Sequence, residues 1–92
     1  MSTENVHPDD AAVDEFAAML KAKLSRARAK GRSGWRDPAW TAEDINRQMH
    51  EHAAKGDPLD VAAYAMFLAL RGERTIAAGR LLDGIEHNGV PE

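Results

Sequence analysis

The sequence predicts an all-α fold, a small bundle of three main helices and a short fourth one. Apolar residues recur at steps of three and four, and helix start and stop signals separate the segments that show this pattern. No segment alternates apolar and polar residues as a half-buried strand would. The length suits one domain, residues 1–92, in which we expect 1–7 and 87–92 to be frayed ends.

The first helix is predicted over residues 8–30. Pro8 suits a first helical position, and the acidic residues after it complement the helix dipole. One apolar stripe follows the helix and is formed by Val13, Phe16, Leu20, Leu24 and Ala27. Gly31 is a natural stop, and basic residues precede it, as is typical of the carboxyl end of a helix.

Charge is strongly segregated along this part of the chain, although the net charge is only −3. Residues 1–15 hold acidic side chains and no basic one, and residues 21–36 hold basic side chains and no acidic one. The basic segment contains Lys21, Lys23, Arg26, Arg28, Lys30, Arg32 and Arg36, with Trp35 among them. Such a run most often forms a solvated helix face. The alternative is a binding surface for phosphate, nucleic acid or an acidic protein.

Residues 31–40 form an irregular connector that carries two of the five aromatic residues, Trp35 and Trp40. In a domain this small, we expect both indole rings to plug one end of the bundle. Stacking on a nucleic-acid base or another ring is the alternative.

The second and third helices are predicted to form an antiparallel hairpin. Thr41 opens the second helix, and Asp44 three residues later approximates a capping box. This helix ends at Gly56, and Asp57 then caps the third helix, with Pro58 just inside it. A link this short folds the third helix back against the second.

The third helix is apolar on almost every side and is expected to form the centre of the core. Between Val61 and Leu70 its one polar group is the hydroxyl of Tyr64. Arg71 and Gly72 close the helix. A short fourth helix is predicted over residues 74–86, where glycines lower the helix propensity.

Composition and motifs exclude several classes of protein. Without cysteine, neither disulfides nor a thiolate zinc site can stabilise the chain. The longest apolar run has about half the length that a membrane span needs, and no signal peptide is visible, so we expect a cytoplasmic protein without membrane contact. No serine or cysteine nucleophile has a base partner, and no glycine-rich loop follows a strand, which excludes those enzyme classes.

Direct nucleic-acid binding is not expected. A helix-turn-helix motif needs a polar face on its second helix, and the third helix predicted here is apolar all round. The remaining route is contact between the basic segment and phosphates, which would tolerate any nucleic-acid sequence and depend strongly on salt.

The carboxylates at the junction of the second and third helices are the candidate metal ligands. Glu51, Asp57 and Asp60 would form an oxygen-rich site suited to Mg²⁺ or Mn²⁺. Each has a simpler explanation, since Asp57 can cap a helix, Asp60 can bind free backbone N–H groups in its first turn, and Glu51 can form an ion pair within its helix. His50, Glu51 and His52 are consecutive and point about 100° apart on a helix, so they cannot all face one ion.

The segment from Gly34 to Glu73 resembles a group of small phage and prophage proteins of mostly unassigned role. The similarity rests on a run of the form EH..KGDP.DVA..AM, which starts at Glu51. Those proteins are in turn similar to the all-α nucleotide pyrophosphohydrolases of the MazG and phage dATP/dGTP type. In that family, Glu-x-x-Glu on one helix and Glu-x-x-Asp on the next hold Mg²⁺ ions that bind the triphosphate and activate water.

The resemblance implies a reduced carboxylate site. Glu51 stands for one carboxylate of the first family helix, but Gln48 and Ala54 occupy the places where its partner would stand. Asp60 matches the aspartate of the second family helix, and Asp57 replaces its glutamate. The resemblance therefore supports the fold better than hydrolysis. It also implies a homodimer, which the apolar third helix makes a further expectation.

We expect a small phage- or prophage-encoded accessory protein that binds a host protein or nucleoprotein complex, an anti-defence inhibitor of the anti-CRISPR kind. The basic segment with Trp35 would be the contact, and the acidic residues before it would mimic nucleic-acid phosphates. No catalytic residue and no cofactor belong to this reading. The alternative is a Mg²⁺-dependent nucleoside triphosphate pyrophosphohydrolase that uses Glu51, Asp57 and Asp60.

Overall fold

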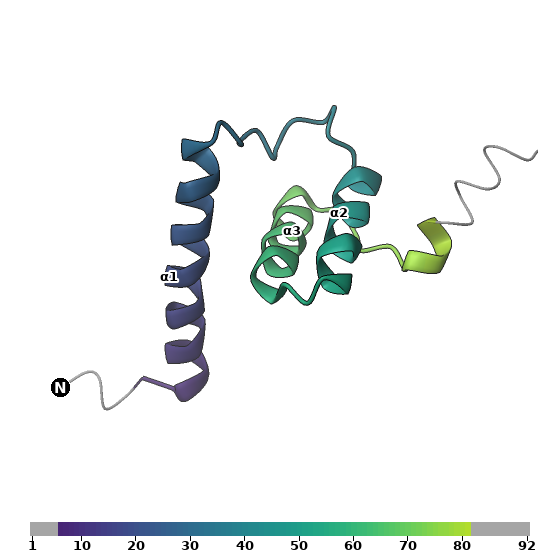
Figure 1. The fold of residues 1–92 in the computed structure, drawn as a ribbon. Coiled ribbons are helices and arrows are strands. Elements are labelled where there is room, and N and C mark those ends of the chain that lie inside the picture. The colour runs from purple at the N-terminus through teal and green to yellow at the C-terminus, as the bar shows by residue number, and fades with distance from the viewer. Residues whose placement is uncertain (1–5, 82–92) are drawn as a thin grey trace, which may run out of the picture. The chain divides into compact units, whose positions relative to one another are not determined.

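The computed structural model describes residues 6–81, which contain three α-helices (Figure 1). They are α1 (Pro8–Ala29), α2 (Ala42–Ala54) and α3 (Pro58–Arg71). A short fourth helical turn follows at residues 78–81. No strand occurs in this part of the chain, which confirms the predicted all-α fold. None of the helices described is long and apolar enough to cross a membrane.

The chain divides into two compact units, residues 1–33 and 34–92, and α1 belongs to the first. It begins as predicted, because the Nδ1 atom of His7 accepts a hydrogen bond from the backbone N–H of Asp9 at 2.9 Å. His7 therefore caps the helix, although we expected it in a frayed end. No residue of α1 is buried.

The second unit contains α2 and α3, which pack against each other as the predicted hairpin requires. The Oγ1 atom of Thr41 accepts a hydrogen bond from the backbone N–H of Asp44 at 3.1 Å. The Asp44 carboxylate accepts one in return from the backbone N–H of Thr41 at 3.2 Å, which confirms the capping box. Gly56, with a φ of +76°, turns the chain between the two helices in a conformation that favours glycine.

The core of this unit lies between α2 and α3. Ile45 and Met49 of α2 and Leu68 of α3 form its buried cluster, and Tyr64 packs against it. Leu70 near the end of α3 is 55% exposed. α3 nevertheless supplies three buried residues, Ala63, Phe67 and Leu68, in line with its expected place in the core.

Both tryptophans close the end of the hairpin, which confirms their predicted packing role. The Trp35 ring stacks on Phe67 with centroids 5.2 Å apart and an interplanar angle of 11°. Trp40 meets Tyr64 and Phe67 edge-on, with centroids 6.2 and 6.0 Å apart. Arg71 secures the connector, because its Nη1 atom donates a hydrogen bond to the Trp35 carbonyl oxygen at 2.7 Å.

A buried asparagine in α2 holds the segment that follows α3. The Asn46 side chain is 0% exposed. Its Nδ2 atom donates to the carbonyl oxygen of Arg74 at 3.1 Å, and its Oδ1 atom accepts from the backbone N–H of Ile76 at 2.7 Å. The Nε2 atom of His50 lies 2.6 Å from the carbonyl oxygen of Ile76. The side chains of Asn46 and His50 thus bind backbone groups that would be paired within the helix if α3 continued.

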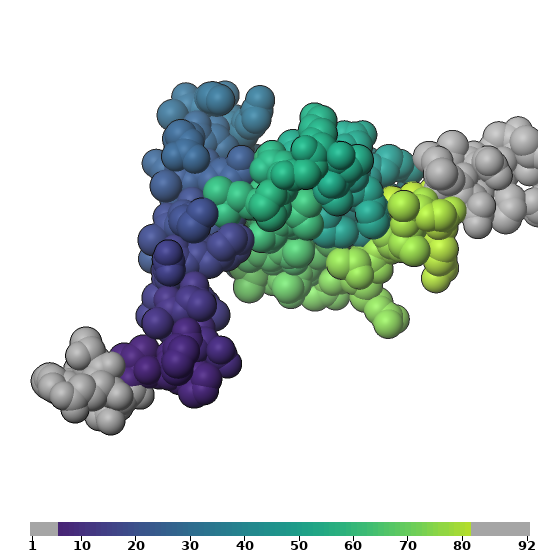
Figure 2. Space-filling model, turned by 60° about the horizontal axis from the view of Figure 1, so that its bottom comes forward, coloured from purple at the N-terminus to yellow at the C-terminus, as the bar shows by residue number. Residues whose placement is uncertain are grey.

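This attachment corrects the predicted fourth helix, which begins at residue 78 and not at residue 74. Residues 73–77 are not helical, because the carbonyl oxygens of Arg74 and Ile76 and the N–H of Ile76 bind side chains of α2. In the space-filling view this segment lies against the hairpin (Figure 2). The rest of the predicted helix and the predicted tail at 87–92 fall outside the described residues.

Candidate functional site

The junction of α2 and α3 brings together three side chains that are able to bind a metal ion. His52 comes from the last turn of α2, and Asp57 and Asp60 come from the start of α3. The Nδ1 atom of His52 lies 3.1 Å from Oδ2 of Asp60 and 3.6 Å from Oδ2 of Asp57. One ligand atom from each residue lies within 4.8 Å of the other two. The turn at Gly56 creates this arrangement by placing the first turn of α3 beside the last turn of α2.

The predicted metal set of Glu51, Asp57 and Asp60 is not what the structure gathers. Asp57 and Asp60 do meet, but His52 accompanies them, and Glu51 is exposed and outside the group. Adjacent helical residues point about 100° apart, so a helix that turns His52 toward α3 turns Glu51 away from it. Among the described residues, Glu51 forms no ion pair with Lys55, which had been its simpler explanation.

Asp57 also differs from its predicted role. It occupies the N-cap position of α3, but its side chain makes no capping hydrogen bond. The backbone of Asp57, with φ −114° and ψ 82°, departs from the extended conformation typical of a capping residue. The prediction of Asp57 as a side-chain cap was therefore wrong. The carboxylate is instead directed toward His52.

The ring nitrogen of His52 that faces the two carboxylates has no hydrogen-bond partner of its own. The Nδ1 atom of His52 is buried and makes no hydrogen bond, although two carboxylate oxygens stand close to it. One imidazole nitrogen and two carboxylate oxygens are ligands that divalent transition metals accept. Donor atoms that share one ion at about 2.0–2.2 Å lie roughly 2.8–3.6 Å apart in octahedral or tetrahedral geometry, and the two distances from Nδ1 fall within that range. The geometry of the site therefore suits a divalent metal ion.

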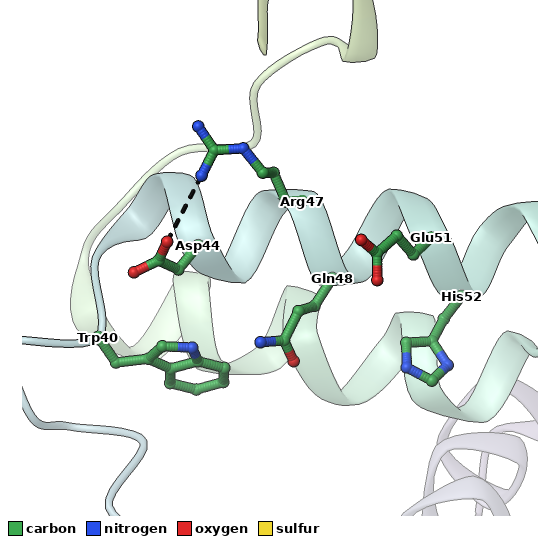
Figure 3. A pocket seen from close by; sticks show the side chains of 6 residues that line it. All are labelled: Trp40, Asp44, Arg47, Gln48, Glu51 and His52. Atoms are coloured by element: carbon green, nitrogen blue, oxygen red, sulfur yellow. Dashed lines mark hydrogen bonds and ion pairs between the residues drawn. The ribbon is translucent and has the colours of Figure 1, made fainter. Parts of the chain in front are cut away.

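A shallow depression of about 430 Å³ lies on the surface of α2 and reaches His52 at one end (Figure 3). Its lining residues are Trp40, Asp44, Arg47, Gln48, Glu51 and His52. Arg47 points out of it and forms ion pairs with Asp44 at 3.4 Å and with Glu43 at 4.0 Å. The walls are mainly polar and the depression is open to solvent, unlike the enclosed apolar cavities that bind small molecules.

The basic segment, which was predicted to contact a partner, is divided between the two units of the chain. Lys21, Lys23, Arg26, Arg28, Lys30 and Arg32 belong to the first unit, and Trp35 and Arg36 belong to the second. Most of these basic side chains are exposed. The Arg36 guanidinium lies 4.3 Å from the Trp35 ring centroid, so Trp35 is engaged within its own unit by Phe67 and Arg36. A role of Trp35 in partner binding stays a prediction.

The predicted metal set left out His52, and the sequence analysis did not identify Asn46 as an anchor. A signal for Asn46 was present, because asparagine is unfavourable inside a helix and stands here between the core residues Ile45 and Met49. No comparable signal singled out His52 over His50, because the direction of each ring depends on the packing of α2.

Comparison with known protein families, curated proteins and solved structures gives no match to this chain. The resemblance to phage proteins and to the all-α pyrophosphohydrolases therefore stays a prediction.

Proposed function

We propose that the protein is a small accessory protein that acts by binding a macromolecular partner through the basic half of α1. One observation carries the proposal: α1 has 22 residues, none of which is buried, and most of the basic side chains in its second half are exposed. A helix needs packing of its apolar face for most of its stability. A long amphipathic helix without such packing in its own unit is suited to meeting another molecule.

The charge pattern favours an acidic protein surface as the partner. The basic half of α1 would attract such a surface and orient it, since segregated charge steers association. Bare nucleic acid fits less well, because the acidic first half of α1 would be repelled by phosphates. α3 does not suit a recognition helix, because Tyr64 is its one polar residue between Val61 and Leu70 and it has no polar face for the major groove. A host protein, alone or in a nucleoprotein complex, is the partner we propose.

The biological role we propose is inhibition of a host defence system by a phage-encoded protein. It rests on the resemblance of the segment from Gly34 to Glu73 and on the small size of a chain whose described part lacks a nucleophile with a base partner. An inhibitor of this kind needs only a binding surface, and α1 offers one.

Capture from a bacterial extract tests the proposal. The full chain is immobilised, and the retained proteins are compared with those held by an Arg26→Glu/Lys30→Glu variant. An Arg74→Glu/Arg80→Glu variant is the matched control, because it makes the same charge change at exposed residues of the second unit. We expect the native chain and the control to retain one partner that the α1 variant loses. Equal retention by all three, or no retained partner, would contradict the proposal.

A second candidate function is carried by the cluster of His52, Asp57 and Asp60. These residues would hold a divalent ion, and a ligand set of one imidazole and two carboxylates suits Mn²⁺ or Zn²⁺ as well as Mg²⁺. A bound ion would supply charge stabilisation for phosphate oxygens and a more acidic water molecule. This arrangement fits a nucleoside triphosphate pyrophosphohydrolase with a reduced site, although Glu51 would not be a ligand.

Pyrophosphate release from a panel of nucleoside triphosphates with Mn²⁺ or Mg²⁺ tests this candidate. Calorimetric titration with Mn²⁺ alone provides a readout that is independent of turnover. Asp60→Asn should abolish both signals, and Asp14→Asn on α1 should change neither. Absence of both signals in the native chain would reject the candidate.

A further inference from the structure

We propose that α1 pairs with α1 of a second copy of this chain in an antiparallel, two-fold symmetric arrangement. The proposal goes beyond partner binding and does not depend on it. Its starting point is the apolar stripe of α1. Taken at 100° per residue, Val13, Phe16, Leu24 and Ala27 all fall within about 40° of Leu20 on the helix surface. Val13 is 65% exposed and Phe16 is 38% exposed, and Leu20, Leu24 and Ala27 are half-buried.

This stripe has the spacing of a helix–helix seam. Its members recur at steps of three and four over residues 13–27, as in the contact positions of a two-stranded coiled coil. α1 is about 33 Å long, and an isolated helix in water is only marginally stable. A second copy would cover the stripe with an identical stripe.

The charges beside the stripe favour a second copy of the chain as its binding partner. They also favour an antiparallel orientation of the two helices. Asp10, Asp14, Lys21 and Arg28 lie on the same flank, about 80–120° from Leu20. The acidic pair precedes Leu20 and the basic pair follows it. A two-fold axis through an antiparallel pair brings the same flank of both copies together in opposite directions.

Opposite charges then meet on this flank. With the axis at Leu20, Arg28 stands opposite residue 12 of the second copy, between Asp10 and Asp14 of that copy. Each of these carboxylates is displaced from Arg28 by about 3 Å along the helix axis. A parallel pair would place acidic ends together and basic ends together, which is unfavourable.

Arg26 and Lys30 lie on the opposite flank, about 80–120° from Leu20 in the other direction. The pairing therefore leaves them outside the contact. A dimer would present this basic flank twice, once on each copy. Loss of the pairing and loss of partner binding are consequently separable, because they depend on different side chains of α1.

Single-cysteine variants test the geometry, because the chain has no cysteine of its own. Leu20→Cys, at the proposed axis, should form a disulfide-linked dimer under mild oxidation. Val13→Cys should not link to itself, since two copies of residue 13 lie about 21 Å apart along the pair, but it should link to Ala27→Cys. Glu15→Cys, about 140° from Leu20, is the control that should stay unlinked. Self-linking of Val13→Cys would show a parallel pair and overturn the proposal.

Reversal of the charges on this flank tests whether a second copy is the partner, and it introduces no covalent bond between the copies. We expect Asp10→Lys/Asp14→Lys and Lys21→Glu/Arg28→Glu each to weaken self-association about tenfold or more, and an equal mixture of the two to restore it. Sedimentation equilibrium supplies the readout, with the native pair at twice the chain mass of 10.1 kDa. A native chain that stays monomeric at millimolar concentration would show that α1 has another occupant. A dimer that neither exchange weakens would show contact through another surface, and either result would overturn the proposal.

Discussion

Replacement of Asn46 by leucine should strongly destabilise the second unit of the chain. The side chain is fully buried and makes three hydrogen bonds, to the carbonyl oxygens of Ala42 at 2.9 Å and Arg74 at 3.1 Å and from the N–H of Ile76 at 2.7 Å. A protein hydrogen bond contributes about 0.5–1.5 kcal/mol net, so the loss amounts to roughly 2–4 kcal/mol. Leucine has a similar volume, and the deficit therefore comes from unpaired backbone groups and not from a cavity.

Urea unfolding followed by tryptophan fluorescence measures this loss. Both tryptophans belong to the second unit, so the signal reports the unit that contains Asn46. Arg47→Leu is the matched control, because it introduces the same residue at the next position. Its ion pairs are partly exposed, at 38% for the Arg47 side chain, and such pairs contribute only about 0–1 kcal/mol.

Amide hydrogen exchange gives a local readout of the same prediction. The N–H of Ile76 should be protected in the native chain and exchange rapidly in the Asn46→Leu variant, while core amides of α2 keep their relative order of protection. A free-energy loss below about 1 kcal/mol would refute the reasoning, because it would mean that the hydrogen bonds contribute little. A protected Ile76 amide in the variant would refute it equally.

Three further predictions concern the ends of α2 and α3 and the connector before them, and urea unfolding checks each of them. Thr41→Ala should lower the free energy of unfolding by about 1 kcal/mol, because it removes one half of the capping box. Asp57→Ala should lower it by less than about 0.5 kcal/mol, because Asp57 makes no capping hydrogen bond. Equal losses for the two variants would contradict this prediction. Gly72→Ala should lower the free energy of unfolding by about 1 kcal/mol, because Gly72 has a φ of +71°, and Gly72→Asn should lower it by less. An alanine variant with unchanged stability would show that the turn relaxes. Trp35→Leu should lower the free energy of unfolding by roughly 1–2 kcal/mol, because the contacts with Phe67 and Arg36 are lost. An unchanged urea midpoint would mean that the stacked geometry is not kept in solution.

The helix boundaries were predictable because their signals are local. Pro8 and Pro58 are the first residues of α1 and α3, and Thr41, which forms the capping box with Asp44, directly precedes α2. The departure after α3 was not predictable in this way. The apolar residues favoured a helix from residue 74, but Asn46 and the segment around Ile76 meet only after α2 and α3 have packed.

The candidate metal cluster was predictable in part for the same reason. Asp57 and Asp60 stand three residues apart in the sequence, so their proximity follows from helix geometry. The third member depends on how α2 is rotated against α3, and this rotation brings His52 and not Glu51 to the junction. Whether a metal ion binds there stays a prediction.

The stripe on α1 was visible in the sequence, but what covers it was not. A pattern of apolar residues shows that a helix face needs a partner without showing whether that partner is another helix of the chain, a second copy or another protein. The division of the chain after residue 33 gives this face no partner inside its own unit. Direct binding measurements are therefore the decisive test of α1.

The affinity of the full chain for its captured partner tests the central claim most directly. It should be measured by calorimetry at low and at high salt for the native chain, Arg26→Glu/Lys30→Glu and Arg74→Glu/Arg80→Glu. We predict that the α1 variant binds about tenfold more weakly or worse, that the control binds like the native chain, and that high salt weakens only the native chain and the control substantially. Equal affinities for all three proteins at low salt would contradict the account, because binding would then not use the basic half of α1.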